Sequence, residues 1–290
     1  MPEKILFVGL GVMGYHMAGH LSKHTEISVF NRTSAKAKVW ANEHKGSVTS
    51  SLHNLPSGIT TIITCIGNDK DLAEVYLSEQ GLIQQCQAGT LLIDHTTASA
   101  EIAQKIASAA QKKGIGFIDA PVSGGEQGAI NGQLTIMCGG STEHYDRAKP
   151  MIAHYARAIS LLGPSGAGQM TKMCNQIAIA GLVQGLAESI HFAEQAGLDA
   201  TQVIDVISKG AAQSWQMENR HSTMIKGEYE HGFAVDLMRK DLDICLSTAR
   251  QINAKLPVTA LVDQFYADVQ DMGGNRWDTS SLLKRLRNKQ

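Results

Sequence analysis

The chain has 290 residues, a mass of 31.2 kDa and 43% hydrophobic residues, which is enough to bury the cores of about two domains. Lysine and arginine number 26 against 27 aspartates and glutamates, so the formal net charge of −1 offers no basic excess for binding nucleic acid. No apolar run reaches the roughly 18 residues of a membrane helix, and the first residues lack a signal-peptide pattern.

Cysteine usage bears on the cellular compartment and on metal binding. The five cysteines are an odd number, lie far apart in the sequence and include no Cys-x-x-Cys pair. This argues against both a disulfide framework and a zinc site. We therefore expect a cytoplasmic globular protein that binds no metal, no membrane and no nucleic acid.

The first half of the chain alternates short apolar segments with helical ones. Strands are expected at residues 5–8, 27–30, 60–66, 91–94, 116–119, 134–138 and 159–162. They are too apolar to alternate between faces, as in a parallel sheet covered on both sides. Helices are expected at residues 13–22, 35–43, 71–77, 99–113 and 143–156. This order predicts an α/β Rossmann domain over residues 1–163, with a doubly wound, mostly parallel sheet.

The pattern changes after Gly163-Pro164-Ser165-Gly166. Residues 169–195 contain no proline and carry apolar residues at helical spacing, which predicts an unusually long helix joining two domains. Further helices are expected at residues 201–208, 236–252, 258–272 and 281–287, and no strand pattern follows. Residues 164–290 are therefore predicted to form an all-helical domain.

The segment Gly9-Leu10-Gly11-Val12-Met13-Gly14 fits G-x-G-x-x-G between the first strand and a helix. In this motif the first glycine permits a tight turn, the second lets the backbone approach a pyrophosphate, and the third lets helix pack on strand. The helix N-terminus offers N–H groups to phosphates. We predict a dinucleotide site formed by Gly9, Gly11, Val12, Met13 and Gly14. The alternative is a glycine turn that serves packing alone.

The end of the second strand indicates which dinucleotide is bound. NAD-binding proteins usually carry a carboxylate there for the ribose 2′-hydroxyl, but this strand ends in Asn31, Arg32 and Thr33. Arg32 offers a planar donor fork suited to a 2′-phosphate, and its two neighbours can add neutral hydrogen bonds. We predict that NADP(H) is preferred and that NAD(H) is possible. The alternative is that Arg32 is a solvated turn residue.

The long helix carries a candidate catalytic lysine near its start. Lys172, Asn175 and Gln176 stand at i, i+3 and i+4 and share one helix face. Burying an ammonium is costly, so a lysine between domains needs a function, unless its end reaches solvent. Such an amine can take a proton from a hydroxyl as hydride leaves carbon, or return one to a carbonyl. Asn175 or Gln176 can orient the same oxygen.

Two polar segments follow predicted strands, at the edge where open α/β sheets bind ligands. They are residues 94–97, Asp-His-Thr-Thr, and residues 119–125, Asp-Ala-Pro-Val-Ser-Gly-Gly. The N–H groups of the second can receive a small carboxylate, although proline and glycine alone can also shape such a turn. His95 has no partner pattern and is assigned no catalytic role. Lys240 is expected either near the cofactor or substrate, or in a solvated charged patch.

Together these motifs resemble the β-hydroxyacid dehydrogenase family, which includes 3-hydroxyisobutyrate dehydrogenase, tartronate semialdehyde reductase and glyoxylate/succinic semialdehyde reductases. The resemblance runs along the whole chain. It rests on residues 119–125, on Gly166-Ala167-Gly168 ahead of Lys172, and on Lys240-Asp241-Leu242. It implies a Rossmann domain, a long interdomain helix and an all-α second domain, in proteins that are commonly dimers or tetramers.

The resemblance also implies roles for individual residues, with Lys172 as the general acid–base. The implied substrate-binding residues are Ser123, Gly124, Gly125 and Thr97. The implied cofactor contacts beyond the glycine turn are Thr97, Lys240, Cys65 and Ile66. Many members carry asparagine four residues after the lysine. Here Gln176 stands at that position with Asn175 before it, as in the tartronate semialdehyde reductase branch, which leaves open which amide contacts substrate. The turn at residues 31–33 resembles NADPH-preferring members.

The leading hypothesis is an oxidoreductase that transfers hydride between NADP(H) and a small 3-hydroxy acid or the matching semialdehyde or 2-oxo acid. A homodimer or homotetramer is expected. The alternatives are an imine reductase, a class that usually lacks this lysine, and a non-catalytic nucleotide-binding sensor or adaptor. A decarboxylating 6-phosphogluconate dehydrogenase would be longer and would need a phosphate-binding cluster. Trp215 is expected either in the core of the helical domain, which we favour, or in a specificity pocket.

Overall fold

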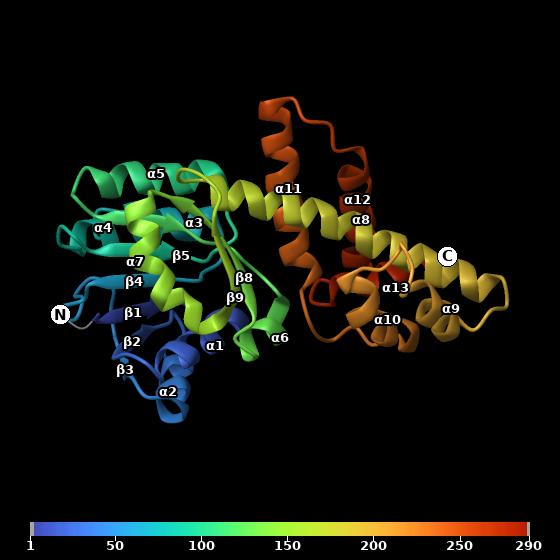
Figure 1. The fold of residues 1–290 in the computed structure, drawn as a ribbon, viewed down its shortest axis with the longest axis horizontal. Helices are drawn as coiled ribbons and strands as arrows, with labels where there is room; N and C mark the ends of the chain where they lie inside the picture. The colour runs from blue at the N-terminus through green and yellow to red at the C-terminus, as the bar shows by residue number, and fades with distance from the viewer. Residues whose placement is uncertain (1–2, 289–290) are drawn as a thin grey trace. The chain divides into compact units, whose positions relative to one another are not determined.

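The structure, a computed structural model, describes residues 3–288 (Figure 1). Four residues lie outside this range: Met1, Pro2 and the last two residues of the predicted second domain. The expectation that the first residues lack a signal-peptide pattern therefore falls partly outside the described residues. The chain divides into two compact units, one ending at Lys172 and the other beginning at Met173. The long helix is α8, Ala167–Gln195, which confirms the helix predicted over residues 169–195. The domain boundary after residue 163 stays a prediction.

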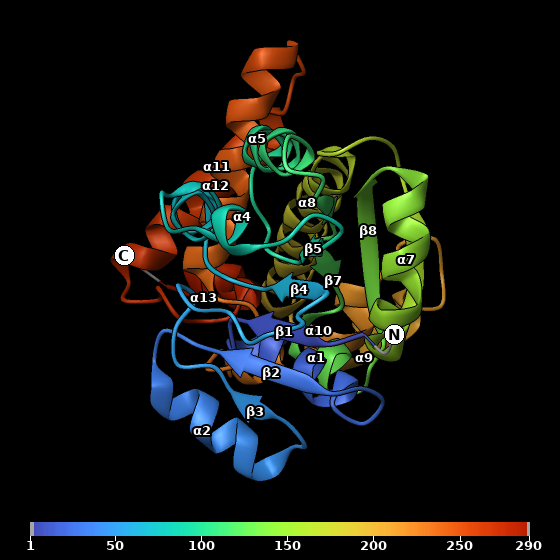
Figure 2. The same ribbon diagram turned by 90° about the vertical axis from the view of Figure 1, so that its left-hand side faces the viewer.

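The first unit contains a nine-stranded sheet in the order β3-β2-β1-β4-β5-β6-β8-β7, with β9 paired to β8 (Figures 1 and 2). The strands are β1 Ile5–Val8, β2 Ile27–Phe30, β3 Ser47–Val48, β4 Thr61–Thr64, β5 Leu91–Asp94, β6 Gly116–Asp119, β7 Val122–Ser123, β8 Leu134–Gly140 and β9 Ala156–Leu161. Pairing is parallel from β3 to β6, and β8 runs antiparallel to β6 and β7. The predicted Rossmann fold with a mostly parallel sheet is confirmed.

The parallel strands end in register along one edge of the sheet. Val8 pairs with Phe30 on one side and with Thr64 on the other. Asp94 pairs with Thr64 and with Asp119. The chain continues outward in opposite directions from β1 and from β4, and doubly wound sheets bind ligands at such a switch point. The loops that follow these five strands therefore leave the sheet side by side.

Helices cover both faces of the sheet. They are α1 Val12–Leu21, α2 Ser34–Glu43, α3 Asp69–Leu72, the π-helix η1 Ala73–Leu77, α4 Leu82–Gln85, α5 Ala100–Gln111, α6 Gly125–Ile130, α7 Thr142–Ile152 and the 3₁₀ turn η2 Ala153–Tyr155. Ile5 and Phe7 of β1 belong to a core with α1, α2 and α7, whereas Leu6 and Val8 belong to a core with η1, α4 and α5. Burial on both faces explains why these strands are continuously apolar in sequence.

Sequence patterns located most of the helices and strands, including several strands of four residues, and missed five elements. β1, β2, β5 and β6 have the predicted bounds, whereas β4 is shorter than predicted and β8 longer. The missed elements are β3, β7, α4, α6 and α10, Trp215–Lys226. The first four have two to six residues, too few to show a period. Helix α10 is largely polar, and its buried residues are Gln216, Met217 and Met224.

The second unit is helical, as predicted. After α8 it contains α9 Ala200–Ile207, α10, α11 Val235–Ile252, α12 Pro257–Asp271, the 3₁₀ turn η3 Thr279–Ser281 and α13 Leu282–Arg287. Within residues 173–288, strand-type pairing is limited to a bridge between Ala234 and Asp278. The favoured placement of Trp215 in the core is wrong, because its side chain is 47% exposed at the start of α10, over the guanidinium of Arg220.

A buried histidine follows β5 in the first unit. His95 Nδ1 lies 2.6 Å from the carbonyl oxygen of Ala120, and Nε2 lies 2.8 Å from the hydroxyl of Tyr155. Because a carbonyl only accepts, Nδ1 carries the proton, and Nε2 of the neutral ring accepts from Tyr155. Burial lowers the pKa of His95 to about 4. Both ring nitrogens of His95 thus have partners inside the first unit.

The neutral state of His95 makes stability depend on pH. The folded pKa lies below that of the unfolded chain, so the stabilisation is complete above about pH 6.5 and is lost as pH falls toward 4. Between pH 7 and 4 we expect wild type to lose about 3 kcal/mol more free energy of unfolding than His95→Gln. Urea unfolding at several pH values measures this, with exposed His53→Gln as the control. Equal pH slopes for wild type and His95→Gln would contradict a buried neutral ring.

Candidate functional site

The three glycines of the turn after β1 differ in why a side chain is absent. A Cβ on Gly9, whose φ is 99°, would lie 2.2 Å from the carbonyl oxygen of Cys65. A Cβ on Gly14 would lie 2.0 Å from the carbonyl oxygen of Gly9. A Cβ on Gly11 would meet nothing within 4 Å among the described residues. Packing therefore requires Gly9 and Gly14, whereas no contact within the described residues requires glycine at position 11.

Helix α1 begins at this turn and is suited to an anion. Its N-cap residue is Gly11, and within the described residues no side chain caps it and its first turn holds no acidic residue. The first N–H groups of a helix have no partner inside the helix, and its dipole places positive charge at this end. The turn and the helix together thus fit the pyrophosphate of a dinucleotide.

The turn after β2 carries the residues predicted to select the cofactor. Asn31 Oδ1 accepts from the backbone N–H of Leu10 at 2.9 Å, and Asn31 Nδ2 donates to the carbonyl oxygen of Thr33 at 3.0 Å. The amide therefore joins this turn to the glycine turn, a role that the sequence did not predict. The side chain of Arg32 is 92% exposed, and its Nη1 lies 3.9 Å from Oδ1 of Asp71.

Cys65 and Ile66 follow β4 and lie against the glycine turn, as the switch-point geometry requires. The carbonyl of Cys65 is the group that a Cβ on Gly9 would strike, and a methyl group of Ile66 is 3.0 Å from the same position. The backbone N–H of Ile66 donates to Oγ1 of Thr96 at 3.0 Å. The structure thus brings together the loops after β1, β4 and β5.

Lys172 lies in the second turn of α8 and is 7% exposed. One turn earlier, Gln169 Oε1 accepts from the backbone N–H of Ala98 at 3.0 Å, and its Nε2 donates to the carbonyl oxygen of Thr96 at 2.7 Å. Thr96 and Ala98 are the two neighbours of Thr97. Gln169 therefore ties the start of the lysine helix to the predicted substrate loop. Sequence reasoning missed it, although its i, i+3 spacing from Lys172 places both on one helix face.

The loop that carries Thr97 is also held by a buried carboxyl group. Asp94 Oδ1 accepts from the hydroxyl of Thr64 at 2.6 Å and from the backbone N–H of Thr96 at 3.1 Å. Burial raises the pKa of Asp94 to about 7. The loop after β5 is thus fixed at both ends by hydrogen bonds to buried side chains.

The predicted carboxylate-binding turn follows β7. Ser123 pairs with Thr135 of β8, and the chain then passes through Gly124 with φ 131° and Gly125 with φ 64° into α6. Two consecutive positive φ values favour glycine, so backbone shape accounts for both residues. Binding of a substrate carboxylate by Ser123, Gly124 and Gly125 stays a prediction.

The remaining predicted residues form a hydrogen-bonded chain within the second unit. Asn175 Nδ2 donates to Gln176 Oε1 at 2.8 Å, and Gln176 Nε2 donates to Asp241 Oδ2 at 2.6 Å. The other oxygen of Asp241 lies 3.1 Å from Lys240 Nζ. Both ends of the Gln176 amide are therefore used inside the protein. Which of the two amides orients a substrate oxygen stays a prediction.

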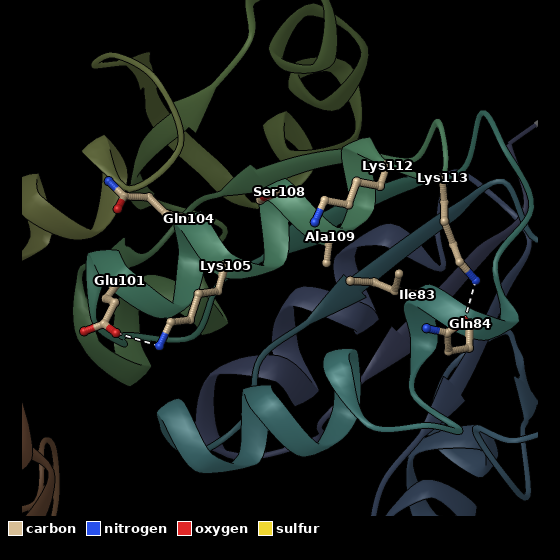
Figure 3. A pocket seen from close by; sticks show the side chains of 9 residues that line it. All are labelled: Ile83, Gln84, Glu101, Gln104, Lys105, Ser108, Ala109, Lys112 and Lys113. Carbon is tan, nitrogen blue, oxygen red and sulfur yellow. Dashed lines mark hydrogen bonds and ion pairs between the residues drawn. The ribbon is translucent and has the colours of Figure 1, made fainter.

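A surface pocket of about 530 Å³ lies at α4 and α5, outside the predicted site (Figure 3). Its lining residues are Ile83, Gln84, Glu101, Gln104, Lys105, Ser108, Ala109, Lys112 and Lys113. Two of its lysines already have partners, since Lys105 pairs with Glu101 and Lys113 donates to Gln84 (Figure 3). No residue of the predicted site lines this pocket.

Within residues 3–288, no group of three or more His, Cys, Asp or Glu side chains is arranged to hold a metal ion. No helix in the same range combines the length and apolar character needed to cross a membrane.

Comparison with known proteins agrees with the fold and the glycine turn. Residues 4–163 match the family model of the NAD-binding domain of 6-phosphogluconate dehydrogenase. Residues 166–286 match the model described as NAD-binding of NADP-dependent 3-hydroxyisobutyrate dehydrogenase. The two models together cover nearly all of the chain.

Relatives of full length extend this similarity. An uncharacterized oxidoreductase of Shewanella frigidimarina is 57% identical, covering 98% of both chains. The 3-hydroxyisobutyrate dehydrogenase of Pseudomonas aeruginosa is 32% identical, covering 98% of this chain and 99% of its own. A solved 3-hydroxyisobutyrate dehydrogenase of Mycobacterium tuberculosis with L-serine superposes with a TM-score of 0.89 at 27% identity, covering 99% of this chain and 100% of its own. The chain belongs to the β-hydroxyacid dehydrogenase family and is an NAD(P)-dependent oxidoreductase of the 3-hydroxyisobutyrate dehydrogenase type.

The glycine turn yields a direct test of nucleotide binding. A methyl group at Gly11 meets no protein atom but stands where the pyrophosphate approaches, so Gly11→Ala should weaken NADPH binding about tenfold or more, or about 1.4 kcal/mol. The melting temperature should stay near that of wild type. Fluorescence titration and thermal unfolding measure the two quantities.

The matched control is Gly14→Ala, whose methyl group would strike the carbonyl of Gly9 and should lower stability. An unchanged dissociation constant for NADPH in a stable Gly11→Ala protein would show that the pyrophosphate does not bind here.

Proposed function

We propose that this oxidoreductase transfers hydride between NADP(H) and a small 3-hydroxy acid or the matching semialdehyde or 2-oxo acid, with Lys172 as the general acid–base. The observation that carries this proposal is the position of Lys172. It is a buried lysine, one helical turn after Gln169, whose amide holds both neighbours of Thr97. A buried amine one turn from the residue that fixes this loop is placed to act on a ligand that binds there.

The residues present fit a nicotinamide dinucleotide. Gly11 and the start of α1 would hold its pyrophosphate, and Cys65 and Ile66 would lie along its adenosine side. The bound nicotinamide would accept or supply the hydride. The protein would contribute the orientation of the substrate and the movement of the proton.

Lys172 would exchange a proton with the substrate oxygen. In the oxidising direction its neutral amine takes the hydroxyl proton as the carbon loses hydride. In the reducing direction its ammonium donates a proton to the carbonyl oxygen as the carbon gains hydride. Asn175 would donate a hydrogen bond to the same oxygen. Gln176 would support Asn175 through the 2.8 Å contact between their amides.

A substrate carboxylate would bind at the turn after β7. The hydroxyl of Ser123 and the backbone N–H groups of Gly124 and Gly125 are hydrogen-bond donors that carry no negative charge, so they suit a carboxylate. Relatives support this class of substrate. The Pseudomonas aeruginosa relative is named for 3-hydroxyisobutyrate, and an Escherichia coli relative 30% identical to this chain is a 2-hydroxy-3-oxopropionate reductase. A cytoplasmic location and a homodimeric or homotetrameric state stay predictions.

The central test is Lys172→Met, which keeps an unbranched apolar stem and removes the proton donor. We expect kcat for a small 3-hydroxy acid or semialdehyde to fall about 10²- to 10⁴-fold, while the dissociation constant for NADPH stays within about twofold. Turnover is followed by NADPH absorbance across a panel of such substrates. Exposed Lys226→Met is the control.

Two outcomes would contradict the proposal. Near-wild-type kcat in Lys172→Met would remove the acid–base assignment. Wild-type protein that binds NADPH yet turns over no member of the panel would support the sensor alternative instead.

The cofactor preference rests on the turn after β2. Arg32 is exposed there, and the position that is acidic in NAD-binding proteins is Asn31. Arg32→Asp should therefore shift the ratio of kcat/KM for NADPH over NADH toward NADH by about tenfold or more, because it exchanges attraction of the 2′-phosphate for repulsion. Exposed Lys255→Asp changes the net charge equally and is the control. A ratio that is the same in both variants would contradict the 2′-phosphate assignment.

A further inference from the structure

Asp119, the last residue of β6, accepts hydrogen bonds from the start of the lysine helix. Its Oδ1 accepts from the backbone N–H of Gly166 at 2.7 Å, and its Oδ2 accepts from the backbone N–H of Gln169 at 3.0 Å. A helix usually receives such a cap from the residue just before it. Here the cap comes from a strand about 50 residues earlier.

The glycines around this contact allow the helix to approach so closely. A Cβ on Gly168 would lie 2.4 Å from the carbonyl oxygen of Met137 and 2.8 Å from Oδ2 of Asp119. A Cβ on Gly139, in the strand beside β6, would lie 2.7 Å from the N–H nitrogen of Gly168. Both positions must therefore lack a side chain. Close packing against β6 and β8 therefore explains the second glycine of Gly166-Ala167-Gly168, and no ligand is needed to explain it.

The first turn of α8 is thus held at two points of the sheet edge. Asp119 binds its backbone, and Gln169 binds the loop after β5 through its side chain. Lys172 is the next residue on the same helix face as Gln169. Because the turn cannot move without breaking both attachments, the position of the amine within the first unit is set by β5 and β6.

We propose that Asp119 is a positioning residue for Lys172: by capping the first turn of α8 it fixes where the amine stands relative to the loop of Thr97. The inference rests on the proposed function, since it presumes that Lys172 transfers the proton. Asp119 itself touches neither substrate nor cofactor in this scheme. Ser123 follows Asp119 by four residues. The end of β6 therefore sets the position of the amine and also the position of the predicted carboxylate-binding turn.

The carboxylate form is required for this cap. The backbone N–H groups of Gly166 and Gln169 face the two oxygens, and a carboxylate accepts at both. Burial raises the pKa of Asp119 to about 6, and the N–H bonds oppose this rise, so the anion dominates at pH 8. An asparagine would turn its NH₂ group toward one of the helix N–H groups, donor against donor.

The experiment compares Asp119→Asn with Asp199→Asn at pH 8. Asp199 caps α9, which carries no predicted site residue, so its variant reports loss of a cap carboxylate alone. We expect Asp119→Asn to lower kcat about ten- to a hundredfold, as misplacement of a catalytic group does, with KM for NADPH within about twofold. Hydrogen exchange at the amides of Gly166, Gly168 and Gln169 should speed up. Asp199→Asn should keep wild-type kcat.

The outcomes separate the inference from the proposed function. If Lys172→Met is inactive but Asp119→Asn keeps wild-type kcat while those amides exchange faster, the positioning role is wrong and the proposed function stands. If Lys172→Met keeps its kcat, both are wrong. If Asp119→Asn does not fold, Gly168→Ala is the second variant, because its methyl group pushes the turn from β6 while the carboxylate remains. Wild-type kcat in Gly168→Ala would overturn the inference.

Discussion

The last residues of β2, β1, β4, β5 and β6 form one row of register partners, so the loops that follow them leave the sheet along a single edge. This pairing brings together residues that are far apart in the sequence. The glycine turn meets the carbonyl of Cys65, and the backbone of Ile66 meets the hydroxyl of Thr96. Parallel pairing in this register is the constraint on which the candidate site depends.

The same edge is buried, and its polar groups must therefore be hydrogen-bonded. Asp94 accepts from Thr64 and Thr96, and Asp119 accepts from the first turn of α8. These two carboxyl groups occupy neighbouring strands, and each keeps a raised pKa because burial disfavours its charged form. The start of α8 supplies N–H donors to the carboxylate at the end of β6. The same hydrogen bonds therefore satisfy a buried group of the sheet edge and hold the start of the lysine helix.

The sequence was sufficient to predict structure where a feature depends on residues that are close together in the chain. The apolar strands, the glycine turn and the long helix each follow from local pattern. It was insufficient where a role depends on contacts across the fold. Nothing near Asn31 or Gln169 in sequence indicates that their amides hold Leu10 or the loop after β5. Trp215 was misplaced because aromatic character predicts burial, whereas this residue is 47% exposed and its ring lies beside the guanidinium of Arg220.

The central claim is that the amine of Lys172 exchanges a proton with the substrate. The most direct measurement is a crystal structure of the protein with NADP⁺ and a bound 3-hydroxy acid. The account predicts a distance of about 3 Å between Lys172 Nζ and the hydroxyl oxygen, with the substrate carboxylate at the turn of Ser123. A substrate whose hydroxyl is bound by other side chains, with Nζ bonded to protein groups alone, would contradict it.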